Sequence, residues 1–368
     1  LAEIEDHLRC NLAQRVKLNQ EQTQDPHAAI IYSIILEDRL ATIVQLPGLP
    51  LSLQTTRIQQ KETERILTHL TDAILKKNRP EVVIEDASTV YQWLVEPAEK
   101  AILEGKADIR TLVFVADGLL KAVPPAVLYD EQQQQYLVEK EQYAIAVLPS
   151  LQLFQQQRLS REGLRALKAG LSEQPVIPNR PNIPAIPYVQ VELDETDAIV
   201  PGQRLLNATF TKAALKQQVM QSSLDLVHLA THGEFSSDPE GTFILAHDQE
   251  IYGAELDGLL RATTNRTLAS LKLLILSACR TATGDSRATL GLAGITTRAG
   301  ASSTLATLWQ VNDAATADLV KAFYQEMVKP NVSLAEALHR AQLTLVKQVR
   351  YRHNHYIWAP YVLVGSWL

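Results

Sequence analysis

Two stretches of almost uninterrupted apolar residues, LDLVHLA at 224–230 and LKLLILS at 271–277, constrain the fold of this chain more than any other feature. Such runs are typical of strands that are buried on both faces of a parallel sheet. Around them, expected strands and helices alternate along the second half of the chain, which predicts a mostly parallel sheet covered by helices on both faces. We therefore expect an α/β fold.

The other elements follow from apolar spacing and from turn residues. In the first half we expect two strands within 30–46 around a turn at Glu37 and Asp38, strands at 111–118 and 136–148, and helices at 53–78, 86–105 and 150–160. In the second half we expect helices at 190–200, 211–220, 255–262, 290–300, 314–328 and 333–348, and strands at 203–206, 224–230, 242–252 (a pair), 271–277, 302–308 and 359–365.

Five prolines lie between residues 173 and 189, which is too many for a helix. This stretch is predicted to be a loop at the edge of a second domain. We expect an N-terminal α/β region over 1–165 and a second α/β region over 166–368. Both halves alternate strands and helices, which favours two related domains, the first of them without catalytic residues.

The composition excludes several classes of protein. The 368 residues are 46% hydrophobic and 21% charged, as in globular proteins, and the formal net charge of −6 provides no electrostatic footprint for nucleic acid. No run of 18 apolar residues predicts a membrane span. The sequence does not begin with methionine, and we expect it to be a piece of a longer protein.

Cys10 and Cys279 are the only cysteines of the chain. Two cysteines exclude a disulfide framework and a zinc site built from thiolates, and they suit a reducing cytoplasm. We expect no metal and no cofactor.

Each of the two apolar runs leads to a reactive side chain, at the point where the strand is expected to end. His232 and Gly233 follow the first run, and Cys279 follows the second, 279 − 232 = 47 residues later. Because ligands bind beyond the carboxyl ends of parallel strands, we expect both side chains at one site. We predict Cys279 as the thiolate nucleophile and His232 as its acid–base partner. The backbone N–H groups of Gly233 and Cys279 are the predicted oxyanion hole.

Plainer interpretations apply to each of these residues alone. A buried cysteine is commonly inert, and a histidine inside a strand is commonly a core residue, which is how we interpret His228. The order, spacing and strand-end positions of His232 and Cys279 together favour catalysis. A zinc site at His228 and His232 needs helical spacing, whereas this segment has strand character. The sequence contains no GxSxG motif, and GLAGITTRAG at 291–300 lacks the ending of a phosphate-binding loop.

Several motifs in order resemble the CHAT domain family, the bacterial relatives of caspases and separases. They are ATHGEF at 230–235, LSACRTATG at 276–284, GLAGITTRAGASSTLATLWQVND at 291–313 and SLAEALHRAQ at 333–342. VFVADGLLKAVPPAVL at 113–128 and AVLPSLQL at 146–153 resemble the non-catalytic first half of that family. The resemblance implies a caspase-like α/β sandwich with a pseudo-protease half before the active half, and it implies that His232 and Cys279 form the dyad.

The resemblance also bears on specificity. LWQVND at 308–313 is similar to a segment of separases, which select arginine with an acidic residue, and this places Asp313 near the pocket for the residue before the cleaved bond. A carboxylate can hold a guanidinium through two hydrogen bonds. Asp318 and Asp285 are further candidates for this role, and Trp309 is a candidate pocket wall. Asn312 or Asp313 could equally be an ordinary helix N-cap.

These observations lead to a prediction of function. We expect a cysteine endopeptidase that cleaves protein substrates after Arg or Lys, controlled by a regulatory protein or an attached tetratricopeptide-type region. The alternative is a non-catalytic CHAT-type interaction module, a pseudoprotease that binds partners through the same cleft.

Overall fold

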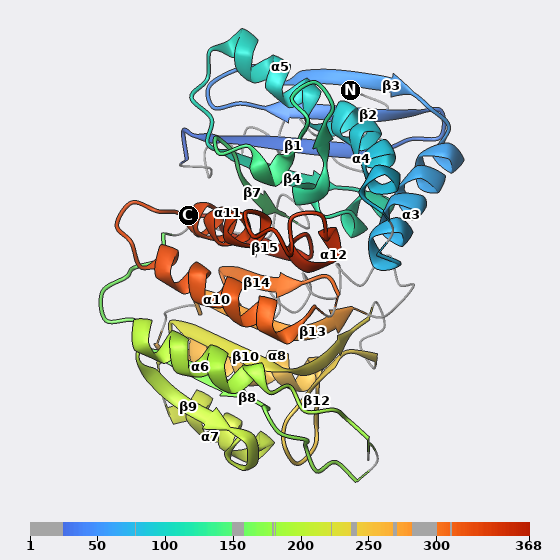
Figure 1. The fold of residues 1–368 in the computed structure, drawn as a ribbon. Helices are drawn as coiled ribbons and strands as arrows, with labels where there is room; N and C mark the ends of the chain where they lie inside the picture. The colour runs from blue at the N-terminus through green and yellow to red at the C-terminus, as the bar shows by residue number, and fades with distance from the viewer. Residues whose placement is uncertain are drawn as a thin grey trace.

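The structure is a computed structural model. It describes residues 25–77, 79–148, 158–178, 180, 182–221, 223–236, 241–267, 271–281, 300–309 and 311–368, with the backbone alone over 262–267 and 278–281. Within these residues, 13 strands form one sheet that runs through the whole molecule (Figure 1). The strands along its path are ordered β12-β11-β10-β13-β14-β15-β7-β4-β1-β2-β3, and β8 and β9 extend it beside β10.

The strands of the sheet are short, and those near its middle are buried. Their bounds are β1 Ala28–Ile35, β2 Arg39–Gln45, β3 Ser52–Arg57, β4 Thr111–Ala116, β7 Ala144–Val147, β8 Ala166–Gly170, β9 Gly202–Leu206, β10 Leu226–Phe235, β11 Phe243–Leu245, β12 Glu250–Tyr252, β13 Leu273–Thr281, β14 Ser303–Thr307 and β15 Tyr361–Gly365. A separate hairpin consists of β5 Tyr129–Asp130 and β6 Gln135–Tyr136.

The sheet joins the two halves of the chain edge to edge. Strands β1 to β4 and β7 form the upper part of the sheet in Figure 1, and β8 to β15 form the lower part. The joint is the parallel pairing of β15 with β7, where Val364 lies opposite Val147. The strands of the two halves therefore form one continuous sheet.

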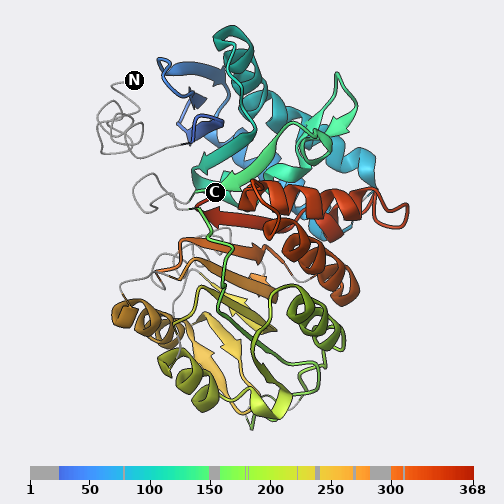
Figure 2. The same ribbon diagram turned by 90° about the vertical axis from the view of Figure 1, so that its left-hand side faces the viewer.

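Helices cover both faces of the sheet. In the second half, α6 and α10 lie against each other on one face, and α7 and α8 lie against each other on the opposite face (Figure 2). The helices are α3 Gln60–Leu75, α4 Pro80–Leu94, α5 Glu96–Gly105, α6 Tyr188–Ile199, α7 Lys212–Gln221, α8 Gly253–Thr267, α10 Asp313–Met327, α11 Leu334–Val346 and α12 His355–Trp358, with short 3-10 turns at Gly118–Ala122, Pro125–Val127, Leu137–Glu139 and Asn207–Thr209. No described helix is long and apolar enough to cross a membrane.

Several expected elements have different bounds in the structure. The helix expected from residue 53 begins at Gln60, because 52–57 pairs with β2 as the edge strand β3. The helix expected over 86–105 is two helices, since Pro97 opens α5 and Val95 separates it from α4. The strand expected over 136–148 is interrupted by a 3-10 turn, and β8 was not expected. The helices expected at 150–160 and 290–300 lie largely outside the described residues.

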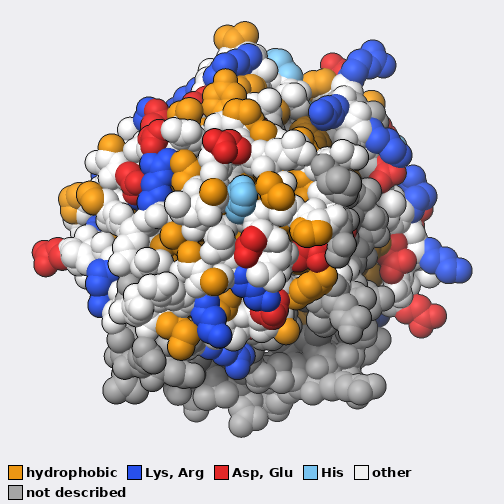
Figure 3. Space-filling view, turned by 90° about the horizontal axis from the view of Figure 1, so that it is seen from below, with side chains coloured by type: hydrophobic (Ala, Val, Ile, Leu, Met, Phe, Trp, Pro, Cys, Tyr) orange, Lys and Arg blue, Asp and Glu red, His pale blue; other side chains and the backbone are white. Residues whose placement is uncertain are grey.

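Acidic and basic side chains are interspersed with apolar ones on the face of the molecule shown in Figure 3. This mixture agrees with the moderate net charge of −6. Interspersed charges of both signs are typical of a soluble surface.

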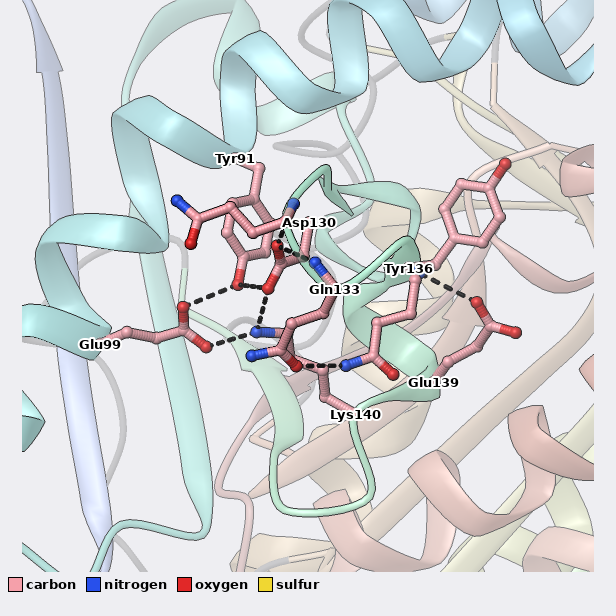
Figure 4. A network of polar contacts seen from close by, with 9 residues as sticks. Tyr91, Glu99, Asp130, Gln133, Tyr136, Glu139 and Lys140 are labelled. Atoms are coloured by element: carbon pink, nitrogen blue, oxygen red, sulfur yellow. Dashed lines mark hydrogen bonds and ion pairs between the residues drawn. The ribbon is translucent and has the colours of Figure 1, made fainter.

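A buried lysine holds three elements of the first half together (Figure 4). The Lys140 side chain is only 1% exposed, and its Nζ lies 2.6 Å from both Glu99 Oε1 and Asp130 Oδ2. The hydroxyl of Tyr91 donates to the same two carboxylates, at 2.8 Å and 3.3 Å. The network thus connects α4, α5 and the β5–β6 hairpin.

We predict that Lys140→Met lowers the free energy of unfolding by about 3 kcal/mol, because it leaves the buried Asp130 and the partly buried Glu99 without their counter-charge. Urea denaturation of the variant and the wild type measures this difference. The matched control is Lys100→Met, since Lys100 is 68% exposed and lies 4.0 Å from Glu104. The control should change stability by less than about 0.5 kcal/mol. Equal effects of the two variants would contradict the structural role of Lys140.

Candidate active site

The parallel pairing of β10 with β13 brings the two predicted catalytic positions to the same end of the sheet. Gly233 lies opposite Cys279 in this pairing, so His232 and Cys279 occupy neighbouring strands at nearly the same level. The sequence predicted that each strand ends at its reactive residue. In the structure both strands continue past these residues, to Phe235 and Thr281. The side chain of Cys279 lies outside the described part of the structure.

The register of this pairing shifts beside His232. Ala230 lies opposite Ser277, and the next registered pair is Gly233 with Cys279, so β10 has one more residue than β13 over this step. A bulge of this kind redirects side chains and is common beside active sites. Thr231 is fixed there, because its hydroxyl donates to the carbonyl of Leu245 in β11 at 2.7 Å. The extra residue therefore changes the direction in which the side chain of His232 leaves the strand, compared with a regular strand.

The imidazole of His232 is held by a backbone carbonyl. Its Nε2 lies 2.8 Å from the carbonyl oxygen of Pro184. A carbonyl only accepts hydrogen bonds, so Nε2 carries the proton and Nδ1 is the basic atom of the neutral ring. Burial lowers the pKa of His232 below its usual value, against the opposing effects of the Pro184 carbonyl and the Asp313 carboxylate. This direction favours the neutral imidazole, the form that a general base requires.

The loop that carries Pro184 is anchored at several points between β8 and α6. Its first residue, Leu171, donates its backbone N–H to the carbonyl of Ala230 in β10 at 3.0 Å. Further along, Arg180 forms an ion pair with Glu250 and lies over the ring of Phe243 at 4.3 Å. This is the proline-rich loop predicted from the sequence, and it brings a carbonyl to His232 that no sequence motif marks.

Asp313 is the first residue of α10 and is half-buried. Asn312 caps the helix, since its side-chain oxygen accepts from the backbone N–H groups of Ala314 at 3.1 Å and Ala315 at 3.2 Å. The capping role is thus filled by Asn312, and the Asp313 carboxylate is near enough to His232 for each to influence the other's pKa. Burial raises the pKa of Asp313, and His232 opposes this rise.

A buried polar network lies in the same two strands, a few residues before the candidate dyad. His228 is fully buried, with Nε2 2.8 Å from Glu192 Oε1 and Nδ1 3.2 Å from the hydroxyl of Tyr324. The hydroxyl of Ser277 donates to the same Glu192 oxygen at 2.6 Å. His228 precedes His232 by four residues and Ser277 precedes Cys279 by two. Glu192 therefore ties α6 to both strands that carry the dyad, and Tyr324 ties α10 to β10.

This network argues against a zinc site formed by His228 and His232. Because both ring nitrogens of His228 are engaged, His228 has no lone pair left for a metal that His232 could share. No group of three or more His, Cys, Asp or Glu side chains suited to a metal ion occurs among the described residues. His228 is the buried core histidine that the sequence predicted.

Two of the other predicted substrate-binding residues have partners other than His232 in the described structure. Trp309 is buried, donates from its Nε1 to the carbonyl of Tyr356 at 2.9 Å, and packs against that tyrosine's ring. Asp318 is 45% exposed and lies 3.2 Å from Arg350 in an ion pair. Asp285 lies outside the described residues. Of the three predicted acids, Asp313 is the one whose interaction with His232 the structure describes.

The chain belongs to the CHAT domain family, whose members match it over residues 85–366. This finding confirms the resemblance drawn from the sequence motifs. No curated protein matches the chain in sequence.

Solved structures give the class of fold. The chain is similar to separase in the Saccharomyces cerevisiae separase–securin complex, with a TM-score of 0.55 and 10% identity over 96% of this chain and 31% of that one. The chain thus spans about a third of that separase. The Arg-specific cysteine proteinase gingipain R gives a TM-score of 0.49 at 12% identity, over 94% of this chain and 78% of that one. The complex of the Porphyromonas gingivalis RgpB pro- and mature domains gives a TM-score of 0.48 at 12% identity, over 83% of this chain and 77% of that one.

The likeness to separase confirms the expected fold class, a caspase-like α/β fold with a large, mostly parallel central sheet. At 10% identity it describes the fold alone.

We predict that Asp313→Asn lowers the pKa of His232 further, because the carboxylate stabilises the imidazolium form. Titration of the protein with isotope-labelled histidine, followed by nuclear magnetic resonance, measures this pKa. Asp318→Asn is the control and should leave it unchanged, since Asp318 pairs with Arg350. An unchanged pKa in Asp313→Asn would show that the two groups are not coupled in solution.

Proposed function

We propose that the protein is a cysteine endopeptidase that hydrolyses protein substrates through His232 and Cys279. The observation that carries this proposal is the pairing of Gly233 with Cys279 on adjacent parallel strands, with His232 held beside them by the Pro184 carbonyl. Membership in the CHAT family and the caspase-like fold support it. A nucleophile, a base and a group that orients the base are the parts that covalent acyl transfer requires.

The proposed reaction follows from the tautomer of His232. Nδ1 accepts the proton of the Cys279 thiol, and the thiolate attacks the carbonyl carbon of the cleaved peptide bond. The backbone N–H groups of Gly233 and Cys279 stabilise the oxyanion that forms. His232 then protonates the leaving amine, the C–N bond breaks, and an acyl-enzyme remains. Water, deprotonated by His232, hydrolyses the acyl-enzyme and restores the thiol.

For specificity, we propose that Asp313 binds the Arg or Lys side chain that precedes the cleaved bond. It lies at the start of α10 and is near enough to His232 for the two charges to interact, it is half-buried, and Asn312 takes the capping role. A partly buried carboxylate binds a guanidinium strongly through charge-assisted hydrogen bonds.

For regulation, we propose a protein partner or an attached tetratricopeptide-type region. The separase of similar fold was solved in complex with the protein securin. This complex supports control of this chain by a protein.

We predict that the wild type cleaves fluorogenic peptides with Arg or Lys before the reporter faster than peptides with Asp or Ala. Cys279→Ala should abolish this cleavage, because it removes the nucleophile. Absence of cleavage with all four peptides, together with equal partner binding by wild type and Cys279→Ala, would contradict the proposal and favour the non-catalytic interaction module.

A second variant separates the two roles open to Asp313. If Asp313 binds the substrate's cation, Asp313→Asn should reduce kcat/KM for Arg peptides by about tenfold or more and should spare Ala peptides. If Asp313 acts only on His232, both kinds of peptide should lose activity equally. Asp318→Asn is the matched control and should leave the ratio unchanged.

A further inference from the structure

A cavity of about 320 Å³ lies away from His232, where the two halves of the chain meet. Its walls come from the end of α3, the start of α4 and the segment that leads into α12. Figure 1 shows α12 beside the lower end of α3, and the two helices are in contact. Its volume is in the range of small-molecule binding sites.

The lining of this cavity is strongly basic. Lys77, Arg79 and Arg350 contribute permanent cations, and the side chain of His353 also lines the cavity. Among the described residues that line it, none is acidic. Part of this charge is already engaged, because Arg350 pairs with Asp318 at 3.2 Å. In the described part of the chain, Arg79 forms no ion pair.

The cations, and not the backbone, supply the positive potential. Arg79 is the N-cap of α4, a helix of 15 residues that begins with Pro80. Because Pro80 has no N–H and Glu81 lies in the first turn, the start of this helix adds little to the positive potential. Lys77 is kept in place by the ring of Tyr356, 4.4 Å from its Nζ.

We propose that this cavity binds a phosphoryl-bearing small molecule. The cations of Lys77, Arg79 and Arg350 line one partly open cavity, together with the polar side chain of Asn354, and dianionic oxygen groups are the ligands that such a set recognises. The carbonyl of Tyr356 also accepts the Trp309 hydrogen bond at 2.9 Å, so the site is in direct contact with the segment that leads to Asp313. The binding site stands independently of the proposed peptidase activity.

The experiment is isothermal titration calorimetry of the full chain with inorganic pyrophosphate, at low ionic strength and without divalent cations. We expect saturable binding to the wild type, weakened about tenfold or more by Arg79→Gln and abolished by Lys77→Gln combined with Arg79→Gln. Arg352→Gln is the matched control, because Arg352 is an exposed cation of the same segment that does not line the cavity. It should bind pyrophosphate as the wild type does.

Three results would overturn the proposal. The first is no saturable binding of pyrophosphate to the wild type. The second is an equal loss of affinity in Arg79→Gln and Arg352→Gln, which would mean general surface charge. The third is equal affinity for citrate, which would contradict the phosphoryl assignment. Thermal unfolding of each variant verifies that lost binding reflects the changed side chain and not a loss of folding, and peptidase activity does not enter the readout.

Discussion

The pairing of β10 with β13 is the constraint on which the candidate site depends. It is a parallel pairing between two buried apolar strands, so its register is set by the core and not by a turn. The position of His232 relative to Cys279 then follows from the shift between Ala230 and Gly233. The His228 network ties both strands to α6 and ties β10 to α10. A buried network of this kind is stable only when every member has a hydrogen-bond partner.

The site divides into a fixed part and an adjustable part. His232 and Cys279 lie on central strands, whereas Pro184 lies on a loop and Asp313 lies at a helix start. Positions at loops and helix ends can vary in a family while the sheet stays the same. This arrangement would allow the proposed acyl-transfer site to serve different substrate preferences. It also makes the Pro184 loop the element whose displacement would disturb His232 most directly, through the loss of one hydrogen bond.

Much of the fold and part of the site could be predicted from the sequence, and the failures have physical reasons. The apolar runs that contain Val227 and Leu274 predicted β10 and β13, because burial on both faces permits few polar residues. Strand β3 was missed because it lies at an exposed edge, where alternation is weak. Strand β8 was missed because its buried Lys168 looks like a surface residue until Asp197 is found beside it. The Pro184 carbonyl that binds His232 is a backbone group. Every residue has a backbone carbonyl, so the sequence does not indicate which one binds His232.

The place of β15 in the sheet has a consequence for synthesis on the ribosome. Residues 361–365 are the last of the described strands to be made, yet they lie between β14 and β7, in the middle of the sheet. Contacts between residues so far apart in the chain form late and slowly. The upper and lower halves can each collapse earlier, but they become a single sheet only after this strand has left the exit tunnel. Until then both β14 and β7 expose an open edge, which is where a nascent chain of this fold is most exposed to mispairing.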